Sequence, residues 1–126
     1  MHKDEITDRL YLIAEAIDVI IDRCIKYKHR TTSFPHLGEF DSCVMRLQTI
    51  GEYVKKIDDK TNKQLLPKYP QVPWVKVIGQ RNIISHEYSA VDEEKIFITI
   101  KKHLPPLKST VLLIIKDIEK DLDSQK

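Results

Sequence analysis

The densest group of side chains able to do chemistry in this chain is the stretch 81-RNIISHEY-88. Arg81 carries a planar guanidinium whose fixed fork of donors matches the oxygens of a phosphate. His86 can take up or release a proton near neutral pH. These two groups suffice for metal-free cleavage of RNA. A base takes the proton from the 2′-hydroxyl, a cation stabilises the charged phosphorane, and an acid protonates the leaving oxygen.

The spacing of this stretch complicates such a site. On an ideal helix, with about 100° per residue, Arg81 and His86 point about 140° apart. Arg81 shares one face with Ser85 and Tyr88, whereas Asn82 and His86 share another. Either the helix ends or distorts between the two faces, or a second copy of the chain completes the site. We favour a composite cleft between two protomers.

A purely structural interpretation of the same residues also stays open. Arg81 can bond to a helix end, His86 can cap the C-terminus of its helix, and Tyr88 can pack as an ordinary aromatic. An Arg-x-x-x-x-His string is weak evidence by itself, so the spacing alone does not choose between the two interpretations.

The elements that position this stretch are predicted to be helices. Apolar residues recur at steps of three and four over residues 4–29, which predicts a long amphipathic helix with its stripe at Ile6, Leu10, Ile13, Ile17, Ile20, Ile21 and Cys24/Ile25. A second stripe predicts a helix over 37–61, with Phe40, Val44, Leu47, Gly51, Val54 and Ile57. Gly51 stands where a side chain is expected, so we predict close approach of a neighbouring backbone, within the fold or across a dimer interface.

The second half of the chain is divided by prolines. Three of the six prolines lie in 67–73, which predicts an extended connector. A helix is predicted over 74–88, with Trp74 in the core, and another over 92–104. Pro105-Pro106 stops or kinks that helix, and the prolines suit the first turn of a last helix that continues over 107–122. A strand is a local alternative there, because Val111 to Ile115 includes β-branched residues.

Length and composition fit a single domain over residues 1–126. The chain has only three glycines, which argues against a sandwich or barrel. We therefore predict an all-α, up-and-down bundle of four to five helices. Cys24 and Cys43 are expected to be free buried thiols of a cytoplasmic protein. The charged start excludes a secretory signal, and no apolar run is long enough for a membrane span.

The net charge of +2 does not by itself predict nucleic-acid binding. Two local clusters of cations have two interpretations each: favourable charges at a helix C-terminus, which we prefer, or contacts to an RNA backbone. These clusters are Lys26, Lys28, His29 and Arg30, and Lys101, Lys102 and His103. The histidines show no ligand-like spacing with Cys, Asp or Glu, so no metal is expected.

From Phe40 to Leu107 the chain resembles the HEPN superfamily and, within it, the HepT-like toxins. The matching residues occur in the family's order and spacing. They are Phe40-Asp41, Val44, Leu47, Ile50-Gly51-Glu52, Val72-Pro73-Trp74, Ile78-Gly79, Arg81-Asn82-x-x-x-His86-x-Tyr88, Val91-Asp92 and Leu104-Pro105-x-Leu107.

The resemblance implies an all-helical homodimer that cleaves RNA with no metal or other cofactor. It implies that Arg81 and His86 are catalytic, that Asn82 orients the substrate or His86, and that Glu52 lines the cleft. It also implies a partner, an MntA-like nucleotidyltransferase antitoxin that transfers AMP from ATP to Tyr88. A bulky anion on that hydroxyl would fill the cleft and occupy Arg81.

Two further functions remain open at this point. One is a non-catalytic HEPN module that binds a nucleotide or a protein and partners a minimal nucleotidyltransferase. The other is a helical bundle with a purely structural role. RNA cleavage that depends on both Arg81 and His86 would separate the ribonuclease from these two.

Overall fold

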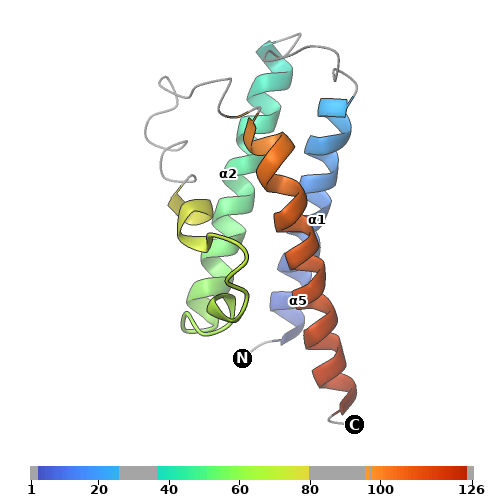
Figure 1. The fold of residues 1–126 in the computed structure, drawn as a ribbon, viewed down its shortest axis with the longest axis vertical. Coiled ribbons are helices and arrows are strands. Elements are labelled where there is room, and N and C mark those ends of the chain that lie inside the picture. Colours follow the sequence, from blue (N-terminus) through green and yellow to red (C-terminus); the bar gives the residue numbers. More distant parts are fainter. Residues whose placement is uncertain (1–2, 26–36, 80–95, 97, 125–126) are drawn as a thin grey trace.

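The computed structural model describes residues 3–25, 37–79, 96 and 98–124 of the chain. Three long helices follow the long axis of the molecule, and none of the described residues forms a strand (Figure 1). They are α1 (Lys3–Ile25), α2 (Leu37–Lys60) and α5 (Leu104–Ser124). Two short elements accompany them, the 3-10 turn η1 (Leu66–Lys68) and the π-helical turn η3 (Thr99–His103). The predicted all-α class is confirmed, and the strand alternative at 111–115 is wrong.

Helix α1 holds the bundle together, because it contacts both α2 and α5. Its predicted stripe is buried from Ile6 to Ile20, with Ile13, Ile17 and Ile20 fully inaccessible, and Ile21 is half-buried. Two polar contacts fix α5 antiparallel to α1. Lys108 Nζ lies 2.6 Å from Asp18 Oδ1, and the Tyr11 hydroxyl donates to Glu119 Oε1 at 3.0 Å. These contacts at the edge leave an uninterrupted apolar seam between the two helices.

Helix α2 buries the predicted stripe from Val44 to Ile57, including Gly51, and the side chain of Phe40 lies outside the described part of the chain. Cys43 and Ile50 are also buried on this face, although the stripe had not included them. The buried Cys43 is a free thiol, as expected. The side chain of Cys24 lies outside the described part of the chain. The burial of Gly51 agrees with close packing at that point, and the identity of the backbone that approaches it stays a prediction.

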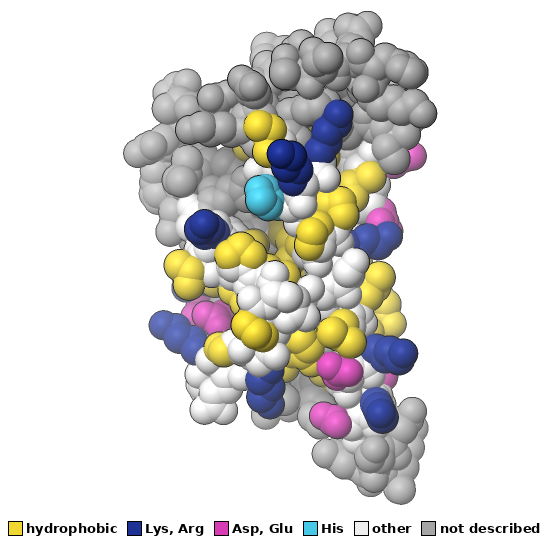
Figure 2. Space-filling view, in the orientation of Figure 1, with side chains coloured by type: hydrophobic (Ala, Val, Ile, Leu, Met, Phe, Trp, Pro, Cys, Tyr) yellow, Lys and Arg dark blue, Asp and Glu magenta, His cyan; other side chains and the backbone are white. Residues whose placement is uncertain are grey.

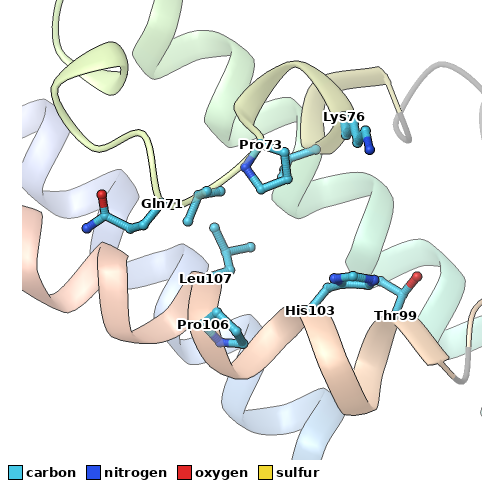
Figure 3. A pocket seen from close by; sticks show the side chains of 9 residues that line it. Gln71, Pro73, Lys76, Thr99, His103, Pro106 and Leu107 are labelled. Atoms are coloured by element: carbon cyan, nitrogen blue, oxygen red, sulfur yellow. The ribbon is translucent and has the colours of Figure 1, made fainter.

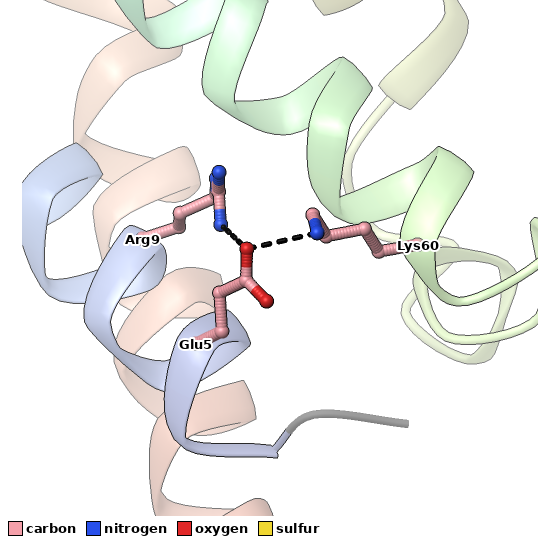
Figure 4. Close-up of polar contacts among 3 residues, drawn as sticks. All are labelled: Glu5, Arg9 and Lys60. Atoms are coloured by element: carbon pink, nitrogen blue, oxygen red, sulfur yellow. Dashed lines mark hydrogen bonds and ion pairs between the residues drawn. The ribbon is translucent and has the colours of Figure 1, made fainter.

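The first turn of α1 is tied to the last turn of α2 by a shared carboxylate (Figure 4). Glu5 Oε1 accepts from Arg9 at 2.7 Å and lies 2.8 Å from Lys60 Nζ. Hydrogen bonds from Lys60 and then Arg9 lower the pKa of Glu5 from 4.5 to about 2. Helix α2 then ends in a turn in which Asn62 and Lys63 take left-handed φ values of 54° and 58°. This turn reverses the chain toward the connector.

The connector was predicted to be extended, and this is only partly correct. It begins with η1, where Pro67 fits the first turn because that position needs no N–H donor. Leu66 and Val72 are buried and hold the segment to the bundle. The connector therefore consists of short turns anchored by two apolar side chains.

A pair of aromatic residues fixes the end of the connector. The Tyr69 hydroxyl donates to Asp117 Oδ2 of α5 at 2.7 Å, and Trp74 Nε1 donates to the Tyr69 carbonyl at 2.9 Å. Burial, and then the hydrogen bond to and charge of Asp117, raise the pKa of Tyr69 to about 12. Trp74 packs half-buried against the core, as predicted. These hydrogen bonds link Trp74, the first residue of the following helix, through Tyr69 to α5.

Pro105-Pro106 were predicted to stop or kink the preceding helix, and the structure shows a local distortion rather than a stop. Turn η3 continues directly into α5, and the Leu104 N–H bonds to the Thr99 carbonyl five residues back. The two prolines have no N–H with which to continue an α-helical ladder, so a wider turn before them lets the helix continue. The prolines do occupy the first turn of the last helix, as expected.

Candidate functional site

The whole of the stretch 81–88 lies outside the described residues. This applies to Arg81, Asn82, His86 and Tyr88, so their roles and mutual geometry stay predictions. Glu52 is described: it lies half-buried on α2, one residue after the buried Gly51. The structure therefore places the elements that lead into the stretch rather than the stretch itself.

The helix that leads to Arg81 is described from residue 74 to residue 79. Its inner side chains, Val77 and Ile78, pack half-buried against the core, whereas Val75 is 85% exposed. A side chain added at Gly79 would meet no atom within 4 Å. Among the described residues, there is therefore room for a small side chain at Gly79.

Beside this helix lies a pocket of about 410 Å³ between the connector and the start of α5 (Figure 3). Such a volume falls in the range of roughly 300–1,000 Å³ common for small-ligand sites. One wall comes from the connector and the helix after it, and the other from η3 and α5. The lining residues are Gln71, Val72, Pro73, Lys76, Val77, Thr99, His103, Pro106 and Leu107.

The pocket combines apolar walls with basic polar groups. Lys76 lies on one wall, and Thr99 and His103 lie on the other (Figure 3). None of the described residues that line it is acidic. Lys101 and Lys102 are exposed in the same π-helical turn as His103. In Figure 2, basic side chains lie around a histidine in the upper half of the molecule, away from most acidic side chains. The pocket is suited to an anion with an apolar portion.

The π-helical turn also bears on the interpretation of this basic cluster. We preferred to explain Lys101, Lys102 and His103 as charges at a helix C-terminus. The helix continues through them into α5. Pro105 and Pro106 have no N–H, however, so carbonyls in the turn before them still lack a backbone donor that these charges can complement. Both explanations, complementary charges in this turn and contacts to an RNA backbone, therefore stay open.

Sequence reasoning did not predict this pocket. The connector, which ends at residue 73, and the last helix, which begins at Leu104, are far apart in the chain, and only the fold brings them together. The available signal was the basic run Lys101–His103 directly before two prolines. The two prolines require an irregular turn if the helix is to continue through them. Such a turn changes the direction in which the neighbouring basic side chains point.

A separate apolar surface lies on α5 and α1. Leu112 and Leu113 are 43% and 41% exposed, and the neighbouring helix exposes Tyr11 and Leu12. Figure 2 shows hydrophobic side chains gathered along the line of α5. Large apolar side chains exposed together are typical of contact surfaces rather than of scattered surface residues.

Two classes of feature are absent from the described part of the chain. No cluster of three His, Cys, Asp or Glu side chains there has the arrangement needed to hold a metal ion. None of the helices described is both long enough and apolar enough to cross a membrane.

Comparison with known proteins decides the family. Residues 13–114 match the model of the family described as Ribonuclease HepT-like. The chain belongs to this family. The match spans most of the chain and includes the whole of 81-RNIISHEY-88 together with both walls of the pocket.

Relatives agree with this assignment. A Methanocaldococcus jannaschii protein provisionally named as an RNase is 36% identical over 120 residues, which cover 94% of each chain. A second protein of that organism, named in the same way, is 38% identical over 73 residues, or 58% of this chain and 60% of that protein. A Thermococcus cleftensis protein provisionally named ribonuclease HepT is 28% identical over 107 residues, covering 85% of this chain and 89% of that protein. No solved structure matches the chain.

Proposed function

We propose that the chain is a metal-independent ribonuclease toxin of a bacterial or archaeal toxin–antitoxin pair. The observation that carries this proposal is the HepT-like family match, which covers the one stretch of the sequence suited to acid–base cleavage of RNA. The provisional ribonuclease names of its relatives support the same activity.

Each polar residue of the stretch has a role in this mechanism. Arg81 binds the scissile phosphate and stabilises the negative charge that develops on the phosphorane. His86 acts as the general acid–base group, taking a proton from the 2′-hydroxyl or giving one to the leaving oxygen. Asn82 orients the substrate or His86, and Glu52 on α2 lines the cleft.

The site is completed by a second copy of the chain. Arg81 and His86 diverge on a straight helix, so a composite cleft is the simplest way to direct both at one phosphate. The apolar surface around Leu112 and Leu113 supports this proposal, because pairing two copies would remove such a surface from water. We therefore propose a homodimer.

An MntA-like nucleotidyltransferase antitoxin is the proposed regulatory partner. It transfers AMP from ATP to the hydroxyl of Tyr88: the phenolic oxygen forms a bond to the α-phosphorus, and pyrophosphate leaves. The added phosphate carries negative charge into the cleft and competes with RNA for Arg81. Co-expression with the neighbouring antitoxin should raise the intact mass by one or more AMP units in the wild type and leave Tyr88→Phe unchanged.

Cleavage of RNA in EDTA tests the central activity. The wild type, made without antitoxin, should cut single-stranded RNA. His86→Ala should lose cleavage by a factor of about 10²–10⁴, the usual contribution of a general acid or base. Arg81→Ala should lose it by a factor of about 10²–10³, the usual contribution of a group that stabilises transition-state charge. Lys56→Ala is a matched control, because Lys56 is an exposed cation on α2 that does not line the pocket. Circular dichroism checks that each variant keeps its helices.

The alternative is a non-catalytic HEPN module that binds a nucleotide and partners a nucleotidyltransferase. The pocket, with its basic groups and apolar walls, supports this alternative, because nucleotide binding there would require no cleavage. RNA left intact by the wild type, together with tight nucleotide binding, would select the module over the ribonuclease.

A further inference from the structure

We infer that the pocket between residues 71–77 and 99–107 is a subsite for one nucleotide of a single-stranded RNA, with the base against the apolar walls and the phosphate on Lys76 and His103. The inference rests on the proposed ribonuclease function. It adds a second contact with the RNA, at a nucleotide other than the one whose phosphate is cleaved.

The walls provide the surface that a base requires. Five of the nine lining residues are apolar: Val72, Pro73, Val77, Pro106 and Leu107. Val72 and Leu107 are buried and belong to the hydrophobic core, so core packing fixes the floor of the pocket. Single-stranded RNA is recognised by bases that leave the stack and enter such sites. A pocket with a rigid apolar floor holds the flat ring of a nucleobase without ordering new side chains.

The polar groups match a phosphate rather than a cation or a peptide. Lys76 and His103 face the pocket from opposite walls, with Thr99 beside His103 (Figure 3). An ammonium and an imidazole N–H are donors, and the Thr99 hydroxyl can donate as well. None of the described residues that line the pocket carries a carboxylate that would repel an anion. Lys101 and Lys102 extend the positive surface along the same turn.

The position in the chain connects the pocket to the proposed catalytic site. Arg81 follows Lys76 by five residues. Because a chain spans at most about 3.6 Å per residue, the two Cα atoms are at most about 18 Å apart. A short single strand covers that distance. The same strand can therefore place one nucleotide in the pocket and a neighbouring phosphate at Arg81.

Turn η3 explains why the pocket exists on this face. A π-helical turn closes its hydrogen bond over five residues, so it rotates the side chains that follow relative to an uninterrupted α-helix. His103 is the last residue of that turn, and Pro106 and Leu107 follow in the first turn of α5. The prolines that require the wide turn also supply part of the apolar wall.

Titration of the full-length protein by NMR tests the site directly. The probes are uridine 5′-monophosphate, ribose 5-phosphate, which lacks the base, and inorganic phosphate. We expect the nucleotide to shift the amide signals of Val72, Val77, Thr99 and Leu107. Ribose 5-phosphate and inorganic phosphate should bind at least about tenfold more weakly, because they cover none of the apolar wall.

The variant Lys76→Ala separates the subsite from the catalytic site, and Lys56→Ala is the control with the same loss of charge. Lys76→Ala should weaken nucleotide binding about five- to tenfold and raise KM for RNA while kcat stays close to the wild-type value. That split is expected for a group that holds the substrate equally well in the ground and transition states. Lys56→Ala should leave Kd, KM and kcat unchanged.

The outcomes distinguish this inference from the proposed function. RNA cleavage by the wild type, with unshifted pocket amides and Lys76→Ala kinetics equal to wild type, would overturn the subsite and leave the ribonuclease intact. Inorganic phosphate that binds as tightly as the nucleotide would overturn the role of the apolar walls. Nucleotide binding in the pocket with RNA left uncut would support the nucleotide site and contradict the ribonuclease.

Discussion

The three-helix scaffold and the pocket region differ in almost every physical respect. In the scaffold, α1 buries an unbroken stripe of aliphatic side chains against α2 and α5, and its polar contacts lie at the edges. In the pocket region, an irregular connector faces a π-helical turn, and basic side chains share the surface with apolar ones. The first arrangement gives stability, and the second leaves unfilled space next to polar groups.

This difference teaches where the molecule can change without losing its fold. Core positions in α1 have neighbours on all sides, so a lost methyl group leaves a cavity. Side chains at the rim of the pocket have solvent on one side, so they can be exchanged at little cost to folding. Function is therefore expected to vary at the pocket, on a scaffold that tolerates little change.

The largest expected effect is on the scaffold. Ile17→Ala should lower the free energy of unfolding by about 2–5 kcal/mol, because Ile17 is fully buried and its removal leaves a cavity between the helices. Val75→Ala, at an 85% exposed position beside the pocket region, should change it by less than about 0.5 kcal/mol. Urea denaturation of both variants measures the contrast. Equal losses of unfolding free energy in the two variants would contradict the difference in packing between the scaffold and the pocket region.

A smaller effect is expected where the two regions are joined. Tyr69→Phe removes the hydrogen bond to Asp117 and should lower the free energy of unfolding by about 1–2 kcal/mol. Thermal unfolding in neutral buffer measures this loss, and Tyr53→Phe is a matched control on α2. An unchanged melting temperature would mean that the connector is held by Leu66 and Val72 alone.

The same hydrogen bond predicts a dependence on alkaline pH. The pKa of Tyr69 is raised from 10 to about 12 in the folded state, so the folded protein keeps a proton that the unfolded chain releases. The stabilisation is fully present below pH 10 and is lost as the pH rises through 12. The wild type should therefore lose more stability over this range than Tyr69→Phe does. Parallel curves for the two proteins would contradict the assignment.

The smallest effect is expected at the exposed edge of the scaffold. Hydrogen bonds from Lys60 and Arg9 hold the pKa of Glu5 at about 2, below its ordinary value of 4.5. The resulting stabilisation is present above pH 4.5 and is lost as the pH falls toward 2. Glu5→Gln should flatten this part of the acid-unfolding curve. Because the pair is exposed, high salt should reduce the difference between the two proteins, and a difference insensitive to salt would contradict a surface ion pair.

The sequence predicted the regular parts of this fold because they follow one physical rule. Apolar side chains at three- and four-residue steps identified α1 and α2, and the buried residues of α1 are those of the predicted stripe together with Ala14. The rule failed where the backbone departs from the α-helix. It did not foresee that η3 would continue the helix into Pro105, nor that η1 would shorten the connector.

For the candidate site, the sequence indicated a chemistry, which stays a prediction, but no geometry. The types and order of Arg81, Asn82, His86 and Tyr88 pointed to acid–base cleavage of RNA, and the family match covers them. The pocket could not be predicted, because Lys76 and His103 are brought together by packing between distant segments. Local patterns carry no information on which distant segments meet, so the pocket required the structure.

The most direct test of the central claim is the chemistry of the RNA ends after cleavage in EDTA, read by mass spectrometry. Attack by the 2′-hydroxyl, with His86 moving the proton, predicts fragments that end in a 2′,3′-cyclic phosphate and a free 5′-hydroxyl. It also predicts that a 2′-deoxy substitution at the cut position blocks cleavage and that His86→Ala yields no fragments. Fragments with 5′-phosphate ends, or cleavage that persists in His86→Ala, would contradict the proposed ribonuclease mechanism.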